Sequence, residues 1–207
     1  MFRLVLALLL AVAGPVSAGT SPTDKALGRL LQSERRAIGS QPEARLASLL
    51  DRPATTVEYS AAWLARQSFE MGGDDWRCLA EALYFEARGE SVKGQFAVAE
   101  VILNRVDSPE FPDDVCAVVR QGTGRRFQCQ FSYTCDGIEE VITEPGALRR
   151  AEKIAHLMLS GAPRPLTGGA TYYHSRAVSP RWARRFERTA TIGVHHFYRM
   201  PTRLSAN

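Results

Sequence analysis

The sequence predicts a mainly helical α+β domain that follows an export signal and a helix-prone leader. Apolar residues recur at helical spacing from 76 to 158, and two β-prone runs follow them near the C-terminus. The 207 residues, 45% hydrophobic and 23% charged, have the composition of one or two ordinary globular domains. A mean hydropathy of −0.18, with a single apolar run at the N-terminus, excludes a multi-span membrane protein.

Residues 1–18 have the pattern of a secretory signal peptide. Arg3 precedes an apolar run over 4–13, which is too short to span a bilayer of about 30 Å. Val16 and Ala18 are small residues placed before a cleavage site. We therefore expect cleavage after Ala18 and a mature protein in the periplasm or outside the cell, with a buried N-terminal helix as the alternative. No cysteine follows Ala18, so a lipid anchor is not expected.

Residues 19–73 are predicted to form a leader or linker without chemistry of its own. Ser21 and Pro22 can begin a helix, since proline is favoured at the first helical position. Leucines then recur at roughly helical spacing, and a second short apolar segment covers 46–50. We expect a domain boundary at the Gly72-Gly73 pair, a catalytic domain over 74–200 and a tail over 201–207.

Four helices and two strands are predicted in this domain. The helices cover residues 76–89, 92–106, 113–122 and 145–161, with Asp113 or Asp114 as the cap of the third and Pro145 at the start of the fourth. Residues 122–137 lack helical periodicity and are rich in glycine and aromatic residues, so we expect a loop there. The strands are expected over 170–174 and 194–198, separated by the arginine-rich stretch 180–188.

The four cysteines are expected to form two disulfides, because an exported chain folds in an oxidising compartment. Three connectivities are possible. We favour Cys129–Cys135, which closes a short loop, together with Cys78–Cys116, which would join two helices. The alternative is that one thiol stays reduced and acts as a nucleophile.

Glu86 is the residue most suited to acid chemistry. It follows Tyr84 and Phe85 and lies three residues before Gly89, where the first helix of the domain is expected to end. A carboxyl group at a helix end, against aromatic rings, loses solvation and has a raised pKa. Such a group keeps its proton near neutral pH and can donate it to a glycosidic oxygen. The alternative is an ordinary solvated glutamate.

Several segments resemble the SleB/CwlJ-type cell wall hydrolases, which include the spore cortex-lytic enzymes. The resemblance runs from about Trp76 to Arg199 and is most specific from Glu86 to Val106. It is carried by the segments CLAEALYFEARGESVKGQFAVAEVILNRV, SPEFPDDVCAVV, CQFSYTC, GGATYYH and VSPRWARR…ATIGVHHFYR. The leader is not covered.

The resemblance implies a lysozyme-like domain that cleaves peptidoglycan between N-acetylmuramic acid and N-acetylglucosamine as a lytic transglycosylase. The catalytic glutamate of the family is the first of its EARGE motif, which falls on Glu86 here. Glu90 is then expected to be structural, capping the next helix or pairing with Arg88 or Lys93. A true hydrolase would need a second carboxylate, and the candidates are Glu81, Glu100 and Asp136.

A sugar-binding groove needs aromatic rings and amide groups, and two segments supply them. Residues Gln130, Phe131, Ser132 and Tyr133 lie between two cysteines and match a family segment; packing of a tight loop is the alternative. In the first predicted strand, Tyr172 and His174 share one face and Tyr173 points the other way. The family also has this histidine, so we expect Tyr172 and His174 in the cleft near Glu86, with a core histidine as the alternative.

Two other classes of protein remain open at this point. His174, His195 and His196, with Glu86 or Glu187, could serve a zinc-dependent amidase, although no HExxH motif is present. A non-catalytic wall-binding module is the other. We expect neither a metal nor another cofactor.

The sequence is mildly basic, with a formal net charge of +4. Residues 161–207 hold eight arginines against a single acid, Glu187. Export makes nucleic acid an unsuitable partner, so we expect peptidoglycan glycan strands as the substrate. The basic segment would favour peripheral contact with an anionic envelope surface, or be a solvated face. We expect a monomer.

Overall fold

The computed structural model describes residues 22–39, 56–124 and 129–201. The chain divides into two compact units, 1–53 and 54–207. The described part of the first is helix α1, Pro22–Gly39, which begins at the predicted proline and exposes Leu27, Leu30 and Leu31. The predicted signal peptide, the apolar segment at 46–50 and most of the tail lie outside the described residues. None of the described helices combines the length and apolar character that a membrane crossing requires.

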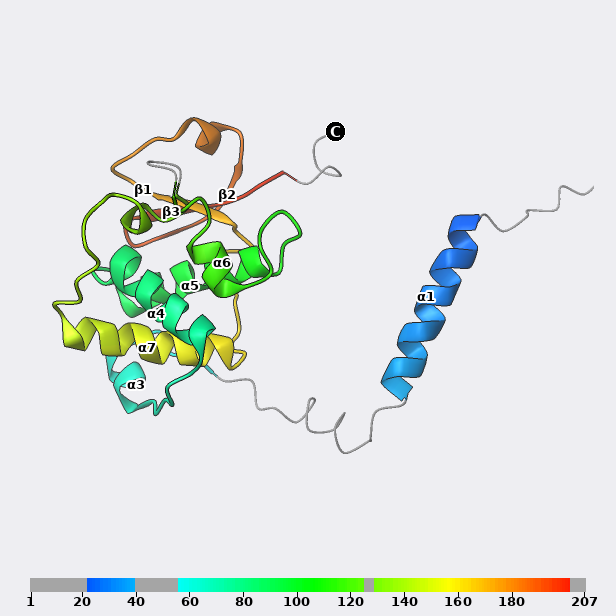
Figure 1. The fold of residues 1–207 in the computed structure, drawn as a ribbon, viewed down its shortest axis with the longest axis horizontal. Helices are drawn as coiled ribbons and strands as arrows, with labels where there is room; N and C mark the ends of the chain where they lie inside the picture. Colours follow the sequence, from blue (N-terminus) through cyan, green and yellow to red (C-terminus); the bar gives the residue numbers. More distant parts are fainter. Residues whose placement is uncertain (1–21, 40–55, 125–128, 202–207) are drawn as a thin grey trace, which may run out of the picture. The chain divides into compact units, whose positions relative to one another are not determined.

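The second unit is mainly helical with a small sheet near its C-terminal end, as the sequence predicts (Figure 1). Its helices are α3 Ala61–Arg66, α4 Asp74–Ala87, α5 Val92–Val106, α6 Val115–Val119 and α7 Pro145–Leu159. The predicted limits of α5 agree with the structure at both ends. Ser91 and Asp114 cap α5 and α6, because their side chains accept hydrogen bonds from backbone N–H groups of the first turn.

Helix α4 lies at the centre of this unit and packs along α7 and against α5 and α6. Its apolar face is buried as predicted, with Leu79 and Leu83 fully inaccessible to solvent. The Trp76 indole N–H donates to the backbone oxygen of Glu152 at 3.0 Å, which ties α4 to α7. Both expected disulfides are formed: Cys78–Cys116 joins α4 to α6, and Cys129–Cys135 closes the loop that contains a single 3-10 turn, η1 Ser132–Thr134.

The compact domain begins earlier than the Gly72-Gly73 boundary that the sequence predicts. Trp63 and Leu64 of α3 are buried in the main core, and the Tyr59 ring meets the Phe96 ring of α5 edge-on at 5.3 Å. Two buried residues in a six-residue helix make no recognisable period, so the sequence pattern reads as a polar leader. The described residues from Val57 onward, which the sequence assigns to the leader, therefore pack with the compact domain.

The sheet has three antiparallel strands in the order β1-β3-β2: β1 Tyr172–Ser175, β2 Glu187–Ile192 and β3 His195–Arg199. The two strands expected at 170–174 and 194–198 are confirmed, and β2 is additional. One face of the sheet packs on α5, where Phe197 is buried with Ala97 and Val101. The other face is covered by the turn that contains a second 3-10 helix, η2 Arg181–Arg184.

Candidate active site

Glu86 lies in the last turn of α4, where the helix end meets the sheet. Its side chain is partly buried, and its Oε2 accepts a hydrogen bond from the Tyr173 hydroxyl of β1 at 3.0 Å. Burial raises the pKa of the Glu86 carboxyl above its ordinary value, while the Tyr173 hydrogen bond and the positive charge of Arg105 partly oppose this rise. The carboxyl group therefore keeps its proton to a higher pH than a solvated glutamate does, as the sequence predicts.

Arg105 is a buried cation whose positive charge acts on Glu86. The side chain leaves α5 towards the interior and is 1% exposed, and its Nε donates to the backbone oxygen of Thr171 at 2.7 Å. Aromatic rings surround the guanidinium, whose carbon lies 5.4 Å from the ring centre of Phe131 and 5.5 Å from that of Phe111. The positive charge of Arg105 favours the charged form of Glu86. It therefore partly opposes the rise in the Glu86 pKa that burial causes.

Tyr133 supplies a second hydroxyl beside Glu86. Its ring stacks on Phe85 at 4.7 Å, and the side chain is 8% exposed. Within the described part of the chain, the buried Tyr133 hydroxyl has no hydrogen-bond partner. Burial raises the pKa of Tyr133 far above its ordinary value, and the negative charges of Glu81 and Glu86 add to the rise. Tyr133 thus stays protonated and is an available donor close to the acid.

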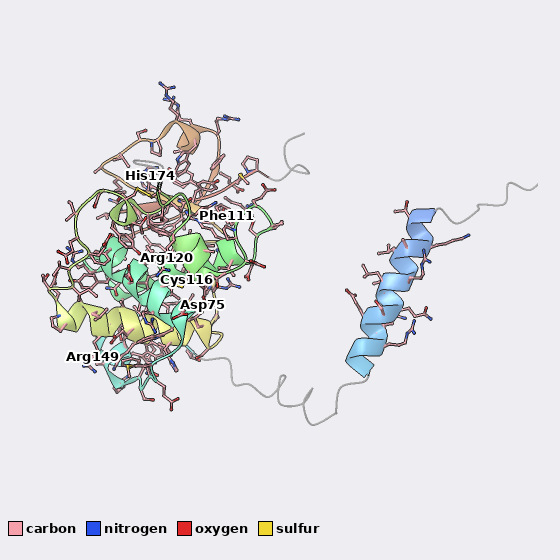
Figure 2. All side chains as sticks on the ribbon, in the orientation of Figure 1. Asp75, Phe111, Cys116, Arg120, Arg149 and His174 are labelled. Carbon is pink, nitrogen blue, oxygen red and sulfur yellow. A yellow bond between two sulfur atoms is a disulfide. The ribbon has the colours of Figure 1, made fainter. Side chains whose placement is uncertain are left out.

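Two pockets lie along α4 and α6 on the Tyr133 side of the site, and Glu86 is not among the residues that line them. One has a volume of about 470 Å³, and the other, of about 180 Å³, extends to Tyr133. Both are lined by Cys78, Glu81 and Arg120, and Figure 2 shows Arg120, Cys116 and Asp75 following one another on this side of the domain. The two linings carry charged side chains of both signs, which suits a polymer with hydroxyl, amide and ionic groups.

The structure corrects the predicted face of β1. Tyr172 and His174 do share a face, but Tyr173 is the residue that points to Glu86. His174 Nε2 lies 3.0 Å from the Tyr198 hydroxyl and the two rings stack, and Tyr172 meets the Phe186 ring at 4.9 Å. His174 and Tyr172 therefore belong to the aromatic cluster on the far face of the sheet, which corresponds to the core alternative for the histidine.

The four residues expected in the loop between the cysteines have different surroundings. Phe131 and Tyr133 lie at the site, against Arg105 and Phe85 respectively. The backbone N–H of Gln130 donates to the Gln121 oxygen at 2.9 Å, at the neck of the loop, and Ser132 is exposed. Their contact with substrate stays a prediction.

The candidate second carboxylates have separate surroundings. Glu100 is 1% exposed and accepts hydrogen bonds from the Leu166 N–H, the Thr167 N–H and the Thr167 hydroxyl, so its oxygens anchor a loop. Asp136 is exposed and accepts from the Ile138 N–H at 2.8 Å. Of these three candidates, Glu81 is the one that lines the two pockets near Tyr133.

The sequence suggested that Glu90 caps the next helix or pairs with Arg88 or Lys93. In the structure Ser91 is the cap, and Glu90 contacts His195 instead. The Glu90 Oε1 lies 3.2 Å from Nδ1 of His195, and both side chains are almost fully buried. Arg88 pairs instead with Glu144, at 3.1 Å.

The histidines proposed as zinc ligands are engaged elsewhere. His195 faces Glu90, and Nδ1 of His196 lies 2.9 Å from the Thr191 hydroxyl. Across the described ranges, the one group of three potential ligand side chains is Asp75, Asp114 and Cys116, and the Cys116 sulfur is already in a disulfide.

Two residues that interact with Glu86, Tyr173 and Arg105, were not predicted from the sequence as site residues. Tyr173 lies between Tyr172 and His174, which were predicted to face the site. Strand alternation alone does not show which face of β1 is turned inward, because that depends on how the sheet packs. Arg105 lies three residues after Ile102 and four after Val101, on the buried face of α5. A charged residue at an apolar position of a helix is the signal that points to such a group.

Comparison with known proteins supports the resemblance. A family model described as cell wall hydrolase matches residues 89–198, starting just after Glu86. The spore cortex-lytic enzyme of Halalkalibacterium halodurans is 38% identical over 125 residues, which are 60% of this chain and 34% of that protein. The enzyme of the same name from Oceanobacillus iheyensis is 34% identical over 125 residues and 41% of its own length. The match thus spans well under half of these relatives.

A solved structure was also found, described as the catalytic domain of the germination-specific lytic transglycosylase SleB from Bacillus anthracis. It is 31% identical, and the alignment covers 64% of this chain and 100% of that one with a TM-score of 0.49.

Proposed function

Because the chain belongs to the cell wall hydrolase family, we propose that it cleaves the glycan strands of peptidoglycan between N-acetylmuramic acid and N-acetylglucosamine. Glu86 is the single catalytic acid. The observation that carries this assignment is a partly buried carboxyl with a raised pKa, held by the Tyr173 hydroxyl at 3.0 Å, on the helix whose neighbouring Phe85 stacks on the pocket residue Tyr133. The two relatives compared above are spore cortex-lytic enzymes, which agrees with a wall substrate.

One carboxyl group is sufficient for a lytic transglycosylase. Protonated Glu86 gives its proton to the bridging oxygen as the glycosidic bond breaks. The resulting carboxylate then takes a proton from the C6 hydroxyl of the muramic sugar, whose oxygen closes onto C1 to give a 1,6-anhydro ring. The Tyr173 hydrogen bond favours the carboxylate form and so supports the first step, in which Glu86 gives up its proton. A hydrolytic route needs a second carboxylate, and Glu100 already accepts three hydrogen bonds.

The products of digestion test this mechanism. We expect the purified mature protein to release muropeptides with 1,6-anhydro-N-acetylmuramic acid ends, which are lighter by one water than hydrolysed reducing ends. Mass spectrometry of the digest separates the two. Release of reducing ends would assign a hydrolase with a second carboxylate, of which Glu81 is the candidate nearest the groove. Activity that is lost on chelation would instead favour the zinc-dependent class.

We also propose that the protein is exported and touches an anionic surface of the envelope. Two disulfides support an oxidising compartment. Five exposed arginines lie within η2 or near it in the sequence: Arg176, Arg181, Arg184, Arg185 and Arg188. The nearby acid, Glu187, pairs with Arg199. The five arginines can therefore bind anionic lipid headgroups without covering the two pockets near Tyr133.

Vesicle binding tests this contact. The variant with Arg181→Gln and Arg185→Gln should bind phosphatidylglycerol vesicles about 30-fold more weakly, since each arginine near such a surface contributes about 1 kcal/mol. The matched control changes Arg149 and Arg150 to Gln; Arg149 lies at the opposite end of the domain from η2 (Figure 2). Equal loss in both variants, or binding that high salt leaves unchanged, would contradict a local electrostatic contact.

A further inference from the structure

Glu86 and Glu90 lie at the two ends of the turn between α4 and α5, and both side chains reach the sheet. Glu86 meets the Tyr173 hydroxyl of β1. Glu90 meets His195 at the start of β3, and its Oε1 also accepts the backbone N–H of Val194 at 3.0 Å. The proposed function uses Glu86 and gives no task to the second, buried glutamate.

The Glu90 carboxylate is enclosed from several sides. Its side chain is 8% exposed and that of His195 is 9% exposed. Gly193 has a φ of +58°, and a Cβ built there would overlap Glu90 Oε2. A Cβ at Gly94 would lie 2.7 Å from the same oxygen. Only glycine at these two positions leaves room for the carboxylate to reach the turn between β2 and β3. The contact therefore depends on a glycine in α5 and on a glycine in the turn.

His195 connects this contact to Tyr173. The His195 ring meets the Tyr173 ring edge-on at 5.1 Å, and Phe197 stacks on Tyr173 at 6.0 Å from the neighbouring strand. The His195 Nδ1 lies within 3.2 Å of Glu90 without the alignment of a hydrogen bond. Glu90 thus holds the strand end through the Val194 N–H and its close contact with the His195 ring, and the His195 and Phe197 rings in turn pack against Tyr173.

We propose that Glu90 is a positioning residue, which fixes the β2–β3 turn against the end of α4 and thereby holds the Tyr173 hydroxyl on the Glu86 carboxyl. This inference rests on the proposed function only for the role of Glu86 in catalysis. The hydrogen bond itself is present in the protein without substrate, so the positioning can be measured independently of any reaction.

The first test is an NMR titration of the Glu86 carboxyl carbon in the wild type and in Glu90→Ala. Loss of the Tyr173 hydrogen bond removes an interaction that favours the charged form, so the pKa of Glu86 rises in the variant. Removal of a nearby negative charge alone would lower it. The sign therefore separates positioning from simple electrostatics, and Tyr173→Phe gives the shift expected for complete loss of the bond.

The second test compares kcat in a double-mutant cycle. Glu90→Ala should lower kcat about tenfold with KM little changed, because misplacement of a positioned group costs one to two orders of magnitude. In the Tyr173→Phe background the same change should cost less than about twofold. Glu90→Gln, which keeps an oxygen for the Val194 N–H, should restore part of the rate and serves if the alanine variant fails to fold.

Glu144→Ala is the matched control, because Glu144 forms an exposed ion pair with Arg88 at the same helix end. It should leave kcat and the Glu86 pKa unchanged. Equal losses in both backgrounds, or a lowered Glu86 pKa in the Glu90 variants, would overturn the proposal. A wild-type protein that is inactive on peptidoglycan would refute the proposed function, and the NMR result would still decide the role of Glu90.

Discussion

Replacing Glu86 by glutamine is expected to lower the turnover of peptidoglycan by about 10²–10⁴-fold, the usual contribution of general acid–base catalysis. Glutamine has the same shape, and its oxygen can still accept the Tyr173 hydrogen bond, but it has no proton to give to the glycosidic oxygen. The rate of release of soluble muropeptides from purified sacculi measures the effect. Thermal unfolding of the variant should remain close to that of the wild type.

Glu144→Gln is a suitable control for this experiment, because Glu144 is exposed and its carboxylate faces the same end of α4. It should retain full activity. If Glu86→Gln digests sacculi as fast as the control does, Glu86 is not the acid, and the groove carboxylate Glu81 becomes the first residue to examine.

The second large effect is on stability, and it concerns Glu100. Glu100→Ala should lower the free energy of unfolding by about 3–5 kcal/mol, because each buried donor that loses its acceptor costs about 1–3 kcal/mol. Three donors on Leu166 and Thr167 lose their acceptor inside the protein. Urea denaturation measures the change, which is a large share of the 5–15 kcal/mol typical of a domain.

Glu100→Gln gives the matched comparison. One amide oxygen can still accept from Thr167, while the amide nitrogen would face the Leu166 N–H, so an intermediate loss is expected. If both variants unfold like the wild type but lose activity, Glu100 acts in the reaction and not in the fold.

Much of the helical part could be predicted because local signals are strong there. The apolar face of α4, the limits of α5 and the Asp114 cap depend on spacing and on one hydrogen bond within a turn. The assignment of Glu86 depended on the EARGE motif, since its aromatic neighbours and the helix end alone also fit a surface glutamate.

The missed features depend on contacts between distant parts of the chain. Strand β2 has an exposed, charged start, and its pairing with β3 shifts register between Arg188 and Ala190, so no clean alternation marks it. The Tyr173 contact with Glu86 joins residues 87 positions apart. Which face of β1 is turned inward is decided by the packing of the whole sheet on α5.

The small sheet works as a partition between two environments. Along β1, residue 173 serves the acid, while residue 174 supports the aromatic layer beneath the arginine turn. Because neighbouring residues of β1 face opposite sides, a substitution at residue 174 can change the aromatic face of the sheet while the Tyr173 contact with Glu86 is kept.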